Sequence, residues 1–115
     1  MTNEKFNEIV ENQLMRCKNI LTSKGIEYAE NEDMNDRLHA FTVAATLEGI
    51  TSKEALAGMM AKHTVSIYDM CRDSEHHSLD KWHEKITDHI NYLLLLIAMI
   101  EEEDAKATKS QVSNN

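Results

Sequence analysis

The feature that most constrains the fold of this chain is its shortage of turn residues. The sequence contains no Pro and only three Gly in 115 residues. Sheet proteins need turn residues at short, regular intervals, and this chain does not supply them. The sequence therefore predicts an all-α domain.

Four helices are predicted from apolar residues that recur at spacings of three and four. Thr51 and Glu54 form a capping box that marks one helix start. Gly25 and Gly49 each follow a helical pattern, where a left-handed cap is common. The expected helices span residues 3–24, 37–48, 51–71 and 78–104. We expect them to form one four-helix bundle-like domain over residues 1–104, followed by a disordered tail over 105–115.

The charge and the cysteines restrict the function classes. The 12 Lys and Arg against 20 Asp and Glu give a net charge of −8, which argues against a duplex nucleic acid as partner. Cys17 and Cys71 lie outside any C-x-x-C pattern, as expected for core residues in a reducing compartment. The first residues lack a basic stretch followed by an apolar run, so we expect no signal peptide. We therefore expect a cytoplasmic protein.

The last predicted helix is apolar on more than one side. Its longest apolar run, from Tyr92 to Ile100, is nine residues and too short to span a membrane, so no membrane partner is expected. A helix that is apolar all round must be enclosed all round, and a chain of four helices has little material for that. The sequence therefore predicts a homodimer or a higher homo-oligomer. The apolar stripe comprises Trp82, Ile86, Ile90, Leu93, Ile97 and Ile100, and Leu95, Ala98 and Met99 lie on the opposite side.

The same helix carries a polar face, on which Glu84, Asp88 and Asn91 lie together. In a dimer this face would point into a cleft. Two carboxylates one turn apart suit Mg²⁺, which prefers oxygen ligands. The alternative is a solvated surface, with the carboxylates paired to Lys81 or Lys85.

The third predicted helix carries His63 within a narrow apolar stripe, and Lys62 and Asp69 lie along the edge of that stripe. A Lys beside a His can receive a phosphate, one as a point charge and the other as a donor. The alternatives are a core histidine bonded to a carbonyl, and a polar edge that faces water. His39 follows Asp36 by three residues, so a hydrogen bond between these side chains is also expected.

Several strings of the sequence resemble a known group of proteins. The strings KGIEYA (24–29), DRLHAFTVAA (36–45), ALAGMMAKHTVSIYDM (55–70) and EKITDHINYLLLLIAMIEE (84–102) resemble a family of small phage and prophage proteins. That family is similar in architecture to the all-α NTP pyrophosphohydrolases of the MazG-like kind. The resemblance implies a dimer, Mg²⁺ held by carboxylates inside a helical bundle, and the host cytoplasm as location.

The resemblance and the spacing together define an expected site. We expect His63, Glu84 and Asp88 to act in catalysis on a nucleoside triphosphate, with Mg²⁺ as cofactor. Substrate-binding residues would be Arg37, His39, Lys62, Asp69 and Asn91, and the metal ligands would be Glu27, Asp36, Glu84 and Asp88.

Two other functions remain open from the sequence. The E-E-x-x-E pattern of the pyrophosphohydrolases is missing from the second and third predicted helices. Its absence favours a protein that binds or sequesters a nucleotide signalling molecule of host defence without cleaving it. The third hypothesis is a helical interaction module that engages a host protein through its acidic surface.

Overall fold

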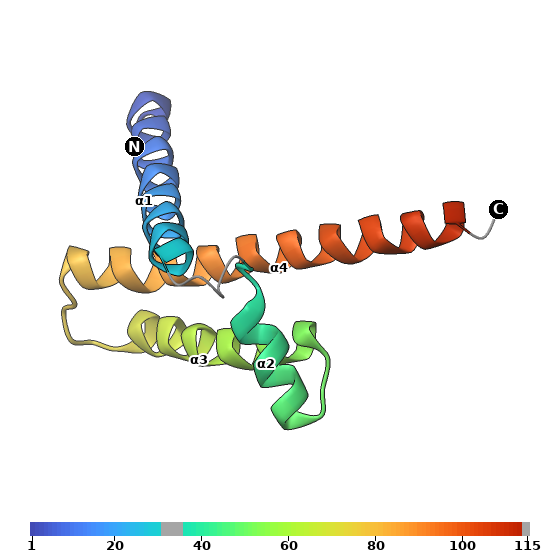
Figure 1. The fold of residues 1–115 in the computed structure, drawn as a ribbon. Coiled ribbons are helices and arrows are strands. Elements are labelled where there is room, and N and C mark those ends of the chain that lie inside the picture. Colours follow the sequence, from blue (N-terminus) through green and yellow to red (C-terminus); the bar gives the residue numbers. More distant parts are fainter. Residues whose placement is uncertain (31–35, 114–115) are drawn as a thin grey trace.

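The computed structural model describes residues 1–30 and 36–113, with the side chains of residues 1–23 and 36–110. Within these ranges the chain is all-helical, as predicted, and its helices pack as a bundle around α4. The order is α1 (Asn3–Glu30), α2 (His39–Glu48), α3 (Ser52–Arg72) and α4 (Leu79–Ser113). Helix α3 packs along α4 and against α2, while α1 contacts α4 (Figure 1).

The predicted signals mark the start of α3 and the end of α2. The Thr51 hydroxyl accepts a hydrogen bond from the Glu54 amide at 3.2 Å, and the Glu54 carboxylate accepts one from the Thr51 amide at 3.2 Å. Gly49 ends α2 in the left-handed region at φ 69°. Capping box and glycine cap are thus both confirmed. At the start of α4, the Ser78 hydroxyl accepts a hydrogen bond from the Lys81 amide at 3.1 Å.

Three predicted helix boundaries are wrong: the ends of α1 and α4 and the start of α2. Helix α1 continues through Gly25 to Glu30, because one Gly inside a helix costs only about 1 kcal/mol and good helix formers follow it. Helix α4 continues to Ser113, past the predicted end near Asp104, through a stretch rich in Ala and Lys. Helix α2 begins at His39 and not at the predicted residue 37, because residues 37 and 38 form a turn.

The core lies where α2, α3 and α4 meet. Leu56 is fully buried there, and Phe41 and Met99 are 7% and 3% exposed. Tyr92, Leu95 and Leu96 pack against them from α4. These α4 residues share one side of the helix, which is therefore its inner face.

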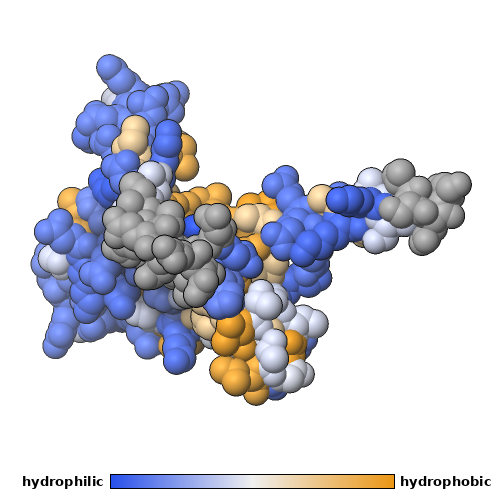
Figure 2. Space-filling view, viewed as in Figure 1, coloured by the Kyte–Doolittle hydropathy of each residue, from blue (hydrophilic) through white to orange (hydrophobic). Residues whose placement is uncertain are grey.

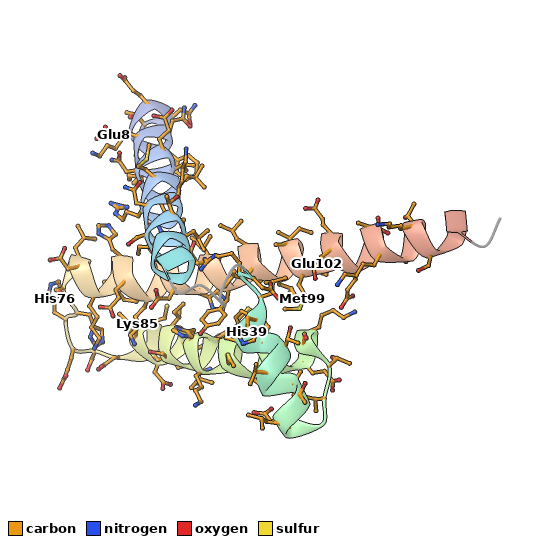
Figure 3. The ribbon with its side chains drawn as sticks, in the orientation of Figure 1. Glu8, His39, His76, Lys85, Met99 and Glu102 are labelled. Carbon is orange, nitrogen blue, oxygen red and sulfur yellow. The ribbon has the colours of Figure 1, made fainter. Side chains whose placement is uncertain are left out.

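Helix α1 is attached to α4 through a small polar contact. The Gln13 amide donates a hydrogen bond of 2.7 Å to the hydroxyl of Thr87, which is 1% exposed. Cys17 lies beside this contact and is 2% exposed, so its prediction as a core residue is confirmed. The same prediction is wrong for Cys71, which is exposed near the end of α3. The N-terminal half of α1, which carries Glu8, stands away from the other helices (Figure 3).

The chain is extended for its size. Its radius of gyration is 17.6 Å, against about 13 Å for a compact domain of this length. Its accessible surface is 8827 Å², against roughly 6400 Å² for a compact monomer of this mass. Both differences arise where the N-terminal half of α1 and the C-terminal half of α4 project from the body (Figure 1).

Candidate functional site: a cavity shared by four helices

One cavity of about 260 Å³ lies where all four helices approach one another. Helices α1 and α2 contribute mainly apolar wall, and α3 and α4 contribute most of the polar groups. The turn before α2 adds Arg37. The lining residues are Ile20, Leu21, Arg37, Ala40, Phe41, Met59, His63, Asp88, Asn91, Tyr92 and Leu95.

Four residues of the expected site line this cavity together: Arg37, His63, Asp88 and Asn91. They come from three separate parts of the chain. Asp88 and Asn91 lie on neighbouring turns of α4 because residues three apart share a helix face. The walls around them are apolar and aromatic, an arrangement typical of small-molecule sites.

The His63 ring is held against an aromatic wall. Its centroid lies 4.9 Å from that of Tyr92, with the two planes tilted by 45°. The contact crosses from α3 to α4 and fixes where the imidazole faces the cavity. Tyr92 was not expected as a site residue, although its spacing of four from Asp88 places both on one side of α4.

Asn91 is buried in an unusual way for an amide. It is 6% exposed, and neither its Nδ2 nor its Oδ1 has a hydrogen-bond partner within the described part of the chain. Thr87, one turn earlier on α4, is buried equally well and is bonded to Gln13. The fold therefore satisfies one polar side chain of this helix and leaves the next one unpaired.

The other residues of the expected substrate site lie outside the cavity lining. Lys62 and Asp69 are exposed on α3, and His39 is half-buried at the start of α2 (Figure 3). Lys62 faces water because it is about 100° around the helix from His63. The expected bond between His39 and Asp36 is not the one observed, since the Asp36 carboxylate accepts from the Leu38 amide at 2.9 Å.

The residues expected to hold Mg²⁺ are not brought together within the described side chains. Asp88 lines the cavity, Glu84 is exposed one turn earlier, and Asp36 lines a different cavity. Glu27 lies outside the described side chains. No group of three or more His, Cys, Asp or Glu in the described ranges is placed to hold a metal ion.

A second, wider cavity of about 530 Å³ adjoins the first. Arg37 lines both, as do Leu21 and Leu95. Asp36 and Glu102 add carboxylates to this second space. Arg37 therefore stands at the junction, where a ligand in the first cavity would reach toward the wider opening.

The loop between α3 and α4 holds a separate polar cluster. His77 Nε2 lies 3.2 Å from Asp73 Oδ2. The centroids of the His77 and Trp82 rings are 6.1 Å apart, and their planes are nearly perpendicular. The hydrogen bond from the Glu75 amide, assisted by His77, lowers the pKa of Asp73 below its usual value. His76 in the same loop lies at the opposite end of the bundle from Met99 (Figure 3). We therefore interpret this cluster as a structural one that stabilises the conformation of the loop.

No match was found to any protein-family model, curated protein or solved structure. Among the described residues, no helix is long and apolar enough to cross a membrane.

Proposed function

We propose that this protein binds a nucleoside phosphate, or another small molecule that carries a phosphate, in the four-helix cavity. The observation that carries the proposal is the convergence of Arg37, His63, Asp88 and Asn91 on one apolar cavity. A well-formed apolar cavity with a few convergent polar groups is where a ligand is expected in a small domain.

The chemistry of these side chains suits such a ligand. A guanidinium recognises phosphate oxygens through a planar fork, so Arg37 at the junction of the cavities would face the phosphate. A protonated His63 would add a second charged donor. The aromatic walls, Phe41 and Tyr92, would cover a flat heterocycle.

Hydrolysis of a nucleoside triphosphate is the second candidate. It is favoured by Asp88 and His63 lining the same cavity, since a carboxylate and an imidazole can together move a proton during attack by water. Mg²⁺ uses one or two carboxylates plus the substrate's phosphates in many such sites, and Asp88 would be the contributing carboxylate here. Binding without cleavage requires fewer groups and is our first choice.

Titration calorimetry with a panel of nucleoside triphosphates, monophosphates and cyclic dinucleotides, each with and without Mg²⁺, tests the proposal. We expect saturable binding of at least one nucleotide and its recovery intact after the protein is heated. Release of pyrophosphate with Mg²⁺, lost in Asp88→Asn at an unchanged melting temperature, would establish hydrolysis instead. Absence of binding across the panel would overturn both and leave the helical interaction module.

Two neighbouring substitutions on α3 provide a matched control. His63→Ala should weaken nucleotide binding about 10- to 100-fold, because a hydrogen bond to a charged group is worth about 1.5–3 kcal/mol. Lys62→Ala removes an exposed side chain outside the cavity lining, and it should leave the affinity unchanged. Equal losses in the two variants would contradict the cavity as the binding site.

The proposal also includes the assembly and the location of the protein. Helix α4 exposes a stripe formed by Ile86, Leu93, Ile97 and Ile100. We propose that a second copy of this chain covers it. The resemblance to phage and prophage proteins supports the host cytoplasm as the location and a role in countering host defence.

A further inference from the structure

The unpaired amide of Asn91 has a free-energy cost. The large majority of buried side-chain polar atoms in native proteins have a hydrogen-bond partner. Leaving one without a partner costs about 1–3 kcal/mol, which is a large share of a small domain's stability. Asn91 is 6% exposed and leaves both its donor and its acceptor unpaired within the described ranges.

The neighbouring residue Thr87 shows that the fold does pair buried polar groups on this helix. Its hydroxyl is 1% exposed and accepts the 2.7 Å hydrogen bond from Gln13 of α1. The two side chains are one turn apart, so α1 passes within reach of this part of α4. Asn91 differs from Thr87 in that it lines the cavity. Its amide therefore has a route to a ligand.

The surroundings of Asn91 identify the kind of group that would complete it. An Asn side chain presents one acceptor oxygen beside two donor hydrogens in a single plane. The matching partner is a flat ring whose edge carries a donor next to an acceptor, the pairing by which Asn recognises a base edge bidentately. Tyr92 and Phe41 line the same cavity and offer the aromatic faces on which a base stacks.

We propose that Asn91 is the residue that recognises the nucleobase of the ligand, through an edge that carries a donor beside an acceptor. This inference rests on the proposed function, because it assigns the heterocycle of the same ligand to the inner end of the cavity. The phosphate then lies toward Arg37, where the two cavities meet. Base specificity thus resides in one buried amide on α4.

The substitution Asn91→Leu tests this assignment because Leu has a similar volume and no polar atoms. The probes are the nucleoside monophosphates and ribose 5-phosphate, which carries the same phosphate without a base. The unsubstituted protein should bind at least one monophosphate more tightly than ribose 5-phosphate. Asn91→Leu should weaken binding of that monophosphate about 5- to 150-fold, since a bidentate contact is worth about 1–3 kcal/mol, and leave ribose 5-phosphate binding unchanged.

The melting temperature without ligand separates this role from a structural one. Removing an unpaired amide should raise the melting temperature of Asn91→Leu, whereas Thr87→Val breaks an existing hydrogen bond and should lower it. Thr87→Val should also keep the preference for the monophosphate.

Three results would overturn the assignment of Asn91. The first is a preference that survives in Asn91→Leu. The second is equal binding of ribose 5-phosphate and every monophosphate by the unsubstituted protein, which would leave phosphate binding standing. The third is no binding of either probe by any variant. The proposed function itself falls only if the full panel of triphosphates, monophosphates and cyclic dinucleotides also fails to bind.

Discussion

Leu56 is the residue on which the packing of three helices depends. It is fully buried and contacts Phe41 of α2 and Met99 of α4 within one cluster. Replacing a buried Leu by Ala removes apolar contacts and leaves a cavity that the surrounding helices close only in part. The cost falls on the same helices that form the candidate site.

Leu56→Ala should therefore lower the free energy of unfolding by about 2–5 kcal/mol. Urea denaturation followed by circular dichroism measures the change. Leu47→Ala is the control, because Leu47 of α2 is 82% exposed and its replacement should change stability by at most about 0.5 kcal/mol. Figure 2 shows that hydrophobic side chains gather on the surface over α2. Similar losses in the two variants would contradict the position of the core.

Individual residues of the site were predicted unevenly from the sequence. Helical spacing was sufficient to group Asp88 with Asn91, since that relation is local to one helix. It could not show that Glu84, on the same face, is exposed, because burial depends on where α1 crosses α4. The contact between His63 and Tyr92 joins residues far apart in the sequence, so helical spacing could not predict it either.

At the scale of elements, helix starts were easier to predict than helix ends. The capping box at Thr51 is a specific pattern of side chains that satisfies free amides, so it marks a boundary clearly. A Gly does so only where the backbone adopts a positive φ. Gly49 does, and it ends α2, whereas α1 continues past Gly25. Sequence alone does not distinguish the two cases.

Gly49 and Gly58 form a matched pair that tests this distinction. A Cβ added at either position meets no atom within 4 Å, so packing does not enter the comparison. Gly49→Ala should destabilise the protein by roughly 1–2 kcal/mol, because its φ of 69° is costly for an L-residue. Gly58→Ala, inside α3, should stabilise it by about 0.5–1 kcal/mol. Thermal unfolding shows whether each variant is more or less stable than the unsubstituted protein. A stability change of the same sign in both variants would contradict the left-handed backbone assigned to Gly49.

At the scale of the whole molecule, the chain exposes more surface than its core accounts for. Isolated helical segments are marginal in water, and most helical stability in proteins comes from packing of an apolar face. The projecting half of α1 nonetheless exposes Phe6 and Leu14, at 57% and 59%. Helix α4 exposes Ile97 at 49%, on the segment that also carries the core residue Met99. The projecting ends of α1 and α4 account for the large radius of gyration, and apolar side chains on both helices are exposed in the single chain.

The exposed stripe of α4 is the surface that we proposed a second copy of this chain covers. Ile86, Leu93, Ile97 and Ile100 repeat at intervals of seven, four and three residues, the spacing of helices that pack along one another. They lie about a third of a turn away from Tyr92 and Met99 on the inner face, so α2 and α3 leave them uncovered. In the proposed dimer, this stripe would meet the same stripe of the second copy, and the dimer would be two-fold symmetric.

Ile97→Glu should therefore convert a dimer into a monomer, because a carboxylate in the middle of a helix–helix interface is desolvated without a partner. Sedimentation equilibrium, or light scattering during gel filtration, measures the mass directly. Leu47→Glu provides the control, since it places the same charge on an exposed apolar residue of α2, away from the stripe, and should leave the dimer intact. A monomeric unsubstituted protein, or a dimer that persists in Ile97→Glu but is lost in Leu47→Glu, would assign the stripe of α4 another role. Nucleotide affinity measured on the Ile97→Glu monomer then shows whether one chain is sufficient for binding, as expected if all the cavity's lining residues come from a single copy.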